Sequence, residues 1–201
     1  MARLTDILGF PAVYRLWQAP FAAAKLRPLR QQNDLGTVRR VLDVGCGPGT
    51  NSTVFSHTDY LGLDLNERYI ELARRRYRGR FKVADVRSYR APAGEAYDFI
   101  LLNSFLHHID DENTERILAN MNSLLSDDGH VHILELVLPE QASISRWLAR
   151  HDRGKFPRPL ERWKQIFSVH FDTVTLKPFP LGLGGITLWN MVYFKGRRKD
   201  G

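Results

Sequence analysis

Between residues 41 and 137 the chain repeats one pattern: a short apolar run, a turn, and then a stretch with helical spacing. The apolar runs lie at residues 41–44, 60–64, 81–85, 97–103 and 130–137. Each has the length of a buried strand, and the stretches between them place apolar residues three and four apart, as a helix does. Strands that alternate with helices form a parallel sheet covered on both faces. The pattern therefore predicts an α/β fold.

The remaining segments fit around this sheet. Residues 140–169 have a helical pattern that is interrupted at 154–159. Two further strands are expected at 171–176 and 187–194, joined by a loop at 177–186 that is too short for another buried helix, so they should pair antiparallel. Residues 1–35 are expected to form one or two amphipathic helices that cover the end of the sheet. We expect a single domain overall, with a cover at 1–35 and the main α/β unit at 36–201.

Composition excludes several classes of protein. No apolar run approaches the ~20 residues that span a bilayer, so no transmembrane segment is expected. The chain has one cysteine, Cys46, which excludes an internal disulfide and is typical of the cytoplasm. The formal charge of +7 is gathered at 74–80, 146–162 and 195–199, and such runs are more often solvated faces than binding sites. Charge alone therefore does not indicate a nucleic-acid partner.

The first turn has glycines at every second position, in the order Asp43-x-Gly45-x-Gly47-x-Gly49. Glycines let the backbone approach a ligand where a Cβ would collide. A dinucleotide-binding turn has the spacing G-x-G-x-x-G and opens a long helix that holds a pyrophosphate. Here the third glycine comes one residue early and the next helix is short. The turn therefore suits a nucleoside with a small zwitterionic tail.

Two carboxylates follow the next strands. Asp64 ends the second strand, where it can accept hydrogen bonds from both hydroxyls of a ribose. Asp85 ends the third, where it can accept one from an adenine amino group. Either aspartate alone would more often be a turn former or a helix cap. Together with the glycine turn, in order along the chain, they predict a nucleoside site at the carboxyl ends of the strands.

These motifs resemble those of class I S-adenosylmethionine-dependent methyltransferases. The stretch 41–50 is similar to the first motif of that family, 63–65 to its ribose-binding motif, and 84–86 to its adenine-binding motif. Residues 97–109 resemble the fourth-strand segment of its small-molecule, ubiquinone-biosynthesis-like branch. The resemblance implies a Rossmann-like fold, with a seven-stranded, mostly parallel sheet whose last strand is antiparallel. It also implies S-adenosylmethionine as cofactor and S-adenosylhomocysteine as product.

The resemblance also assigns residues to parts of the cofactor. The glycine turn would lie beside the methionine part, Asp64 would lie beside the ribose, and Asp85 with Val86 would lie beside the adenine. Asn103 and Ser104 would lie along the methionine tail. The full set expected to bind the cofactor is Asp43, Gly45, Cys46, Gly47, Gly49, Asn51, Asp64, Leu65, Asp85, Val86, Asn103 and Ser104.

Candidate catalytic groups follow the fourth strand. If the acceptor is a hydroxyl or a protonated amine, a base helps to remove its proton, and the ordinary pKa of histidine lies near neutrality. His107 and His108 are the candidates for that base. The segment resembles that of phosphoethanolamine methyltransferases, in which a tyrosine from the N-terminal helix closes over the histidine, and Tyr14 is the matching candidate here. The alternative is that both histidines cap the loop and that Tyr14 is a packing residue. We expect no metal, because no further ligands converge on these histidines.

The acceptor side is less constrained by sequence. Arg153, Lys155 and Arg158 mix with aromatic and proline residues in a predicted loop, where they are candidates to clamp a carboxylate or phosphate. An equally good interpretation is a salt-bridged surface connection. Glu135, polar within an apolar strand, and Trp17, in the N-terminal cover, complete the candidate acceptor-binding set.

The function predicted from these features is methyl transfer to a small organic acceptor, with an anionic acceptor as one option. The methylated atom is undetermined, and both a monomer and a homodimer are open. RNA or protein methylation is the alternative that the basic charge encourages, but no appended RNA-binding module or amino-methylation motif follows the fourth strand. A further alternative is an S-adenosylmethionine-binding protein with non-methylating chemistry.

Overall fold

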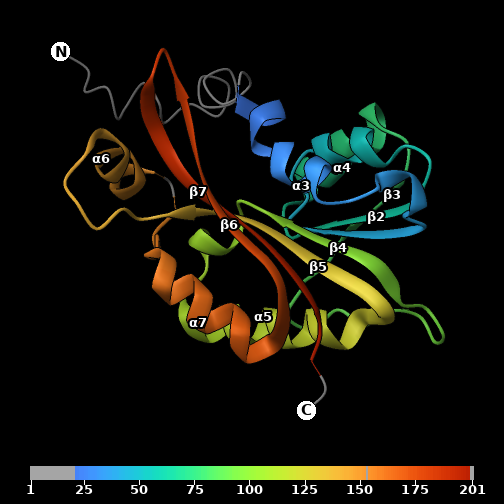
Figure 1. Ribbon diagram of the computed structural model, residues 1–201. Helices are drawn as coiled ribbons and strands as arrows, with labels where there is room; N and C mark the ends of the chain where they lie inside the picture. The colour runs from blue at the N-terminus through green and yellow to red at the C-terminus, as the bar shows by residue number, and fades with distance from the viewer. Residues whose placement is uncertain (1–20, 153, 200–201) are drawn as a thin grey trace.

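The computed structural model describes residues 21–152 and 154–199, and its centre is a twisted sheet (Figure 1). The sheet has seven strands in the order β3-β2-β1-β4-β5-β7-β6. Their bounds are β1 Arg40–Val44, β2 Asp59–Asp64, β3 Arg80–Val83, β4 Tyr97–Asn103, β5 Leu125–Val137, β6 Phe171–Leu183 and β7 Ile186–Arg198. The first five strands pair in parallel, and β7 pairs antiparallel with both β5 and β6. The predicted fold class is confirmed.

Helices cover both faces of this sheet. Their bounds are α3 Arg27–Gln31, α4 Glu67–Arg76, α5 Asp111–Leu124, α6 Ile144–His151 and α7 Leu160–His170, with short 3-10 turns η1 Leu35–Thr37, η2 Thr50–Phe55 and η3 Leu106–His108. In Figure 1, α3 and α4 lie on one face, α5 and α7 lie on the other, and α6 lies beside the β6–β7 hairpin. Residues 21–25 are also helical, in the region predicted as a cover. None of the helices described is both long and apolar enough to cross a membrane.

Local sequence explains where the helices begin. The Asn66 side chain accepts hydrogen bonds from the backbone N–H groups of Arg68 and Tyr69, at 3.1 and 3.3 Å, and so caps α4. Asp110 caps α5 in the same way through the Asn113 N–H at 2.8 Å. Such caps replace the helical partners that the first N–H groups of a helix lack.

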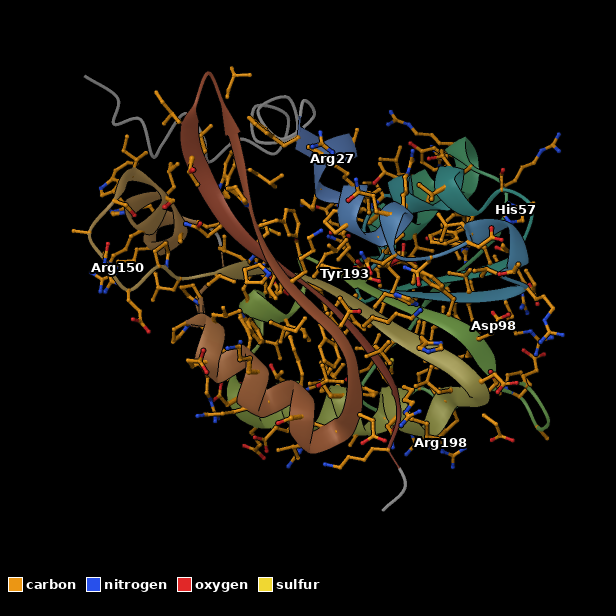
Figure 2. The ribbon with its side chains drawn as sticks, viewed as in Figure 1. Arg27, His57, Asp98, Arg150, Tyr193 and Arg198 are labelled. Atoms are coloured by element: carbon orange, nitrogen blue, oxygen red, sulfur yellow. The ribbon has the colours of Figure 1, made fainter. Side chains whose placement is uncertain are left out.

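The sheet separates two cores because successive strand residues point to opposite faces. Leu42 packs with the residues of α5 and α7, whereas Val41 packs with those of α3 and α4. Tyr193 of β7 lies near the middle of the molecule, while Arg150 and Arg198 lie at its periphery (Figure 2). The Tyr193 hydroxyl lies 2.8 Å from Nδ2 of Asn33, and this contact ties the segment after α3 to the sheet.

The C-terminal hairpin differs from the prediction. The expected loop at 177–186 is wrong: β6 continues to Leu183 and β7 begins at Ile186. Pro178 and Pro180 lie within β6, which is at the edge of the sheet, where prolines are tolerated. The hairpin turns at Gly184 and Gly185, whose φ angles of 57° and 80° suit a tight two-residue turn. The long hairpin therefore extends past the body of the sheet (Figure 1).

The fifth strand begins earlier than expected. Residues 127–129, which precede the apolar run at 130–137, lie within β5, between the pairs Tyr97–Leu125 and Phe99–His130, where the register shifts. The order of strands reverses between β1 and β4, which is where ligands bind in open parallel sheets. The carboxyl ends of these two strands carry the glycine turn and Asn103.

Candidate functional site

A cavity of about 260 Å³ opens at the carboxyl ends of β1 and β4. Its residues come from the glycine turn, the end of β4, η3, the hairpin and the N-terminal segment. They are Phe21, Lys25, Gly45, Cys46, Gly47, Pro48, Thr50, Asn51, Asn103, Ser104, His107, His108, Leu136, Asp152, Leu181, Trp189 and Met191. The structure therefore brings one half of the predicted cofactor set together with both predicted histidines.

The glycine turn is shaped for a ligand at Gly47. Gly45, Gly47 and Gly49 have φ angles of 68°, 53° and 83°, a region that L side chains rarely adopt. A Cβ at Gly45 would lie 2.4 Å from the Phe105 ring, and one at Gly49 would lie 2.8 Å from the Ala73 side chain. At Gly47 an added Cβ would meet no atom within 4 Å. Packing thus explains the outer two glycines, whereas Gly47 faces open space in the cavity.

Behind the turn lies a chain of polar side chains that starts at Asp43. Its buried carboxylate accepts a hydrogen bond from the Tyr60 hydroxyl at 2.5 Å and one from Asn51 Nδ2 at 3.1 Å. Asn51 Oδ1 in turn accepts from Asn103 Nδ2 at 3.1 Å. Burial raises the pKa of Asp43 to about 7. These hydrogen bonds join the ends of β1 and β4, and the side chains present amide groups to the cavity.

Asp64 braces the glycine turn from the end of β2. One carboxylate oxygen accepts from the Gly47 N–H at 2.9 Å and the other from the Asn66 N–H at 2.8 Å. A carboxylate has about four lone-pair directions, so both oxygens keep capacity for the hydroxyls of a ribose. Leu65 beside it is exposed, whereas Cys46 is buried and its thiol pKa is raised by that burial.

Asp85 lies after β3, near the protein surface. Arg87 holds it through Nε at 3.0 Å and Nη2 at 2.6 Å, and this pairing keeps the pKa of Asp85 below its usual value. Val86 is buried beside it. An adenine amino group would share the Asp85 carboxylate with Arg87.

The end of β4 carries a strained residue. Ser104 has a φ of 54°, the one positive φ among the non-glycine residues described. Strain of this kind is found where the surrounding structure holds a functional group in place. Its hydroxyl accepts a hydrogen bond from Lys25 Nζ at 3.0 Å. Burial lowers the pKa of Lys25. The Lys25 amine thus lies at the wall of the cavity, where the charges of Glu135 and Asp152 favour its protonated form and burial opposes it.

His107 lies between two carboxylates. Its Nδ1 contacts Glu135 Oε1, and its Nε2 lies 3.2 Å from Asp152 Oδ2. Glu135 is fully buried and also accepts from the N–H groups of Phe105, Leu106 and Leu136, at 3.1, 2.7 and 2.9 Å. The two carboxylates outweigh the effect of burial and raise the pKa of His107 to about 9.

This environment revises the role predicted for His107. An imidazolium with partners at both nitrogens has no lone pair with which to take a proton at neutral pH. In this structure the His107 ring therefore links Glu135 and Asp152, and both of its nitrogens are occupied. The ring of His108 lies 4.2 Å from that of His107, centroid to centroid, and His108 is exposed on the cavity wall.

Two of the predicted acceptor-binding residues have structural roles instead. Arg158 is buried, and its guanidinium pairs with Asp111 at 2.6 Å and donates to the carbonyls of Leu106 and Ile109 at 3.2 and 2.7 Å. It also lies over the Trp163 ring, with 4.7 Å to the centroid. The Glu135 carboxylate already contacts His107 and accepts hydrogen bonds from three backbone N–H groups, as described above. Neither residue lines the cavity, and nor does the exposed Lys155.

Three other candidates, Tyr14, Trp17 and Arg153, lie outside the described residues. In the described part of the chain, no group of three or more His, Cys, Asp or Glu side chains is arranged so that it could hold a metal ion.

The sequence interpretation missed the residues that complete the cavity. Asp152 comes from the end of α6, and Leu181, Trp189 and Met191 come from the hairpin. Phe21 packs edge-on against Trp189 at 5.1 Å. The alternation Trp189–Met191, which puts both side chains on one face of β7, was the available signal. It could not be used because the hairpin was expected to be much shorter.

Residues 41–129 match a family model described as "Methyltransferase domain". The chain contains a methyltransferase domain. This match covers the glycine turn, Asp64, Asp85 and the end of β4.

Relatives of known function are distant. The methyltransferase domain and its flanks are 27% identical over 203 residues to a trans-aconitate 2-methyltransferase of Delftia acidovorans, covering 91% of this chain and 72% of that protein. A second trans-aconitate 2-methyltransferase, from Variovorax paradoxus, is 28% identical over 65% of this chain and 49% of its own length. The chain spans half or less of the length of three of the curated relatives that it matches.

A solved structure supports the fold. The N-methyltransferase NodS from Bradyrhizobium japonicum, in complex with S-adenosylhomocysteine, superposes with a TM-score of 0.73 at 18% identity, over 97% of this chain and 96% of that one. The methyltransferase domain thus has the class I, Rossmann-like fold.

Proposed function

We propose that this protein is an S-adenosylmethionine-dependent methyltransferase that acts on a small organic acceptor. The observation that carries the proposal is the glycine turn, where Gly47 faces open space and Asp64 stands beside it. The match of residues 41–129 to a methyltransferase domain supports the same conclusion.

The residues present fit the cofactor. Gly45, Gly47, Asn103 and Ser104 would hold the methionine part at the cavity. Asp64 would hold the ribose through its remaining lone pairs, and Asp85 with Val86 would hold the adenine. When bound, the cofactor supplies an electrophilic methyl group. The protein's part is then to bind and orient the acceptor and to exclude water.

The acceptor is proposed to have an apolar body and an anionic group. Phe21, Leu181, Trp189 and Met191 give the cavity an apolar wall. Lys25 lines the same cavity, and within the described part of the chain it forms no ion pair closer than 4 Å. A desolvated ammonium attracts a carboxylate or phosphate strongly.

A cytoplasmic location and a monomer or homodimer accompany this proposal. The single, buried Cys46 supports a reducing compartment.

The test is calorimetric titration of the full chain with S-adenosylmethionine and S-adenosylhomocysteine, with NADH as the control. We expect micromolar binding of the first two and none of NADH. Acceptor candidates are then screened by the release of S-adenosylhomocysteine. Cofactor binding without product from any acceptor would favour non-methylating chemistry, and no binding of either compound would overturn the proposal.

A further inference from the structure

Asp152 is a carboxylate that reaches the cavity from a segment remote from the cofactor motifs. It follows α6 and lines the same cavity as Gly47, Asn103 and Ser104. Its Oδ2 atom lies 3.2 Å from His107 Nε2. The side chain is 9% exposed, so it is held at the wall and does not extend into solvent.

His107, which contacts Asp152, is itself held in place by Glu135. His107 is fixed at Nδ1 by Glu135, and Glu135 is fixed by the backbone N–H groups of Phe105, Leu106 and Leu136. Charge-assisted hydrogen bonds of this kind are among the strongest in proteins. The row Glu135–His107–Asp152 therefore runs from the buried centre of β5 to the cavity and ends in a hydrogen-bond acceptor.

We infer that Asp152 is a catalytic residue that accepts the proton of a protic acceptor, a hydroxyl or an amine, and that His107 and Glu135 position it. The inference rests on the proposed function and narrows its acceptor class. The acceptor's oxygen or nitrogen uses its lone pair to form the bond to the methyl carbon. The bond from that carbon to sulfur breaks, with its electron pair staying on sulfur. The acceptor's proton passes to the Asp152 carboxylate and then to solvent.

The charge of the site explains why the acceptor should carry a hydroxyl or an amine. A nucleophile with O–H or N–H becomes more positive as it attacks, and a fixed carboxylate stabilises that charge. A carboxylate nucleophile has no proton to lose and would be repelled by Asp152. Lys25, on the wall of the same cavity, is attracted by the charges of Glu135 and Asp152 and can also bind a separate anionic group of the acceptor. The combination predicts an acceptor that carries one anionic group and one protic group.

Binding of three matched probes to the protein saturated with S-adenosylhomocysteine tests this inference. The probes are 3-hydroxybenzoate, benzoate and isophthalate, which differ in having a hydroxyl, a hydrogen or a second carboxylate at one position. We expect 3-hydroxybenzoate to bind about tenfold more tightly than benzoate, the scale of a hydrogen bond to a charged group. Asp152→Ala should abolish this difference while leaving the affinity for S-adenosylhomocysteine unchanged.

A control variant and a rate measurement complete the test. Asp127→Asn alters a carboxylate whose side chain is fully exposed on β5 and should change none of these affinities. With any hydroxyl acceptor that is methylated, Asp152→Asn should lower kcat more than it raises KM. Equal binding of the three probes, tighter binding of isophthalate, or an unchanged kcat would overturn the inference. If S-adenosylhomocysteine itself fails to bind, the proposed function fails with it, so the two failures are distinguishable.

Discussion

A Cβ atom added to Gly154 would lie 2.1 Å from Cδ2 of His107 and 2.8 Å from its carbonyl oxygen. At Gly154 the backbone therefore passes against the His107 ring with no room for a side chain; residues 154–158 are here called the strap. The Phe156 N–H donates to the His107 carbonyl at 3.0 Å, and Arg158 pairs with Val137 at the end of β5. The strap thus holds η3 against the sheet.

Gly154→Ala should displace either the strap or the imidazole. We expect a loss of about 1–3 kcal/mol in the free energy of unfolding, the range for overpacking, because backbone atoms cannot move aside as a flexible side chain can. Urea denaturation measures this loss. Gly36→Ala is the control, since the atom nearest to its added Cβ is a side-chain oxygen of Asp34 at 3.2 Å. Equal stability of the two variants would contradict the close packing at His107.

Stability should decline in the alkaline range. The pKa of His107 is raised from 6.5 to about 9, so its ion pairs contribute fully below about pH 6.5 and are lost as the pH rises through about 9. The charged groups around it are Glu135, Asp152 and Lys25. The free energy of unfolding, measured by urea denaturation from pH 6 to pH 10, should fall over this interval.

Glu135→Gln tests the cause of that decline. Removing the carboxylate charge should return the pKa of His107 toward its ordinary value, and the fall of the free energy of unfolding at alkaline pH should become smaller. NMR titration of the imidazole protons follows the pKa directly. Glu112→Gln, in an exposed pair with Arg116, should leave the titration unchanged. A His107 that titrates near pH 6.5 in the unmodified protein would show that the two carboxylates do not hold its proton.

Trp189→Ala should weaken binding of the acceptor and leave binding of the cofactor unchanged. Trp189 supplies much of the apolar wall and packs on Phe21, so its truncation should raise KM for a methylated acceptor roughly tenfold, the scale of a buried aromatic contact. The affinity for S-adenosylhomocysteine, measured by calorimetry, should not change. Trp147→Ala, which removes an exposed ring stacked on His151, is the matched control. A change of cofactor affinity at Trp189 would instead place this residue at the cofactor.

Asp64→Ala should weaken binding of S-adenosylmethionine tenfold or more, the scale of a lost charge-assisted hydrogen bond. Part of the loss arises in the protein itself, because the carboxylate also fixes the Gly47 N–H. Asp59→Ala, on the same strand but paired with Arg80 at the surface, is the control in the same calorimetric titration. Unchanged affinity in Asp64→Ala would remove the ribose assignment.

The sequence alone predicted the sheet, its helices and the cofactor turn because these depend on local signals. Strand-length apolar runs, the Asn66 cap and the glycine spacing act over a few residues, and each agrees with the structure. The hairpin was predicted too short. Its strand β6 continues through Pro178 and Pro180, which are tolerated at the edge of a sheet, and the position of a strand within a sheet is not a local property.

The roles of the polar residues were decided by tertiary structure. Arg158 carries the sequence signature of an anion clamp, yet its donors satisfy carbonyls and Asp111 inside the protein. His107 looks like a base until Glu135, 28 residues away, and Asp152, at the end of α6, are brought to its two nitrogens. The protonation of a side chain depends on the charges and burial around it, and these are set only when distant segments meet. The sequence therefore determined the fold and where the cofactor site lies, whereas the folded chain decided the charge of each group and which residues face the acceptor.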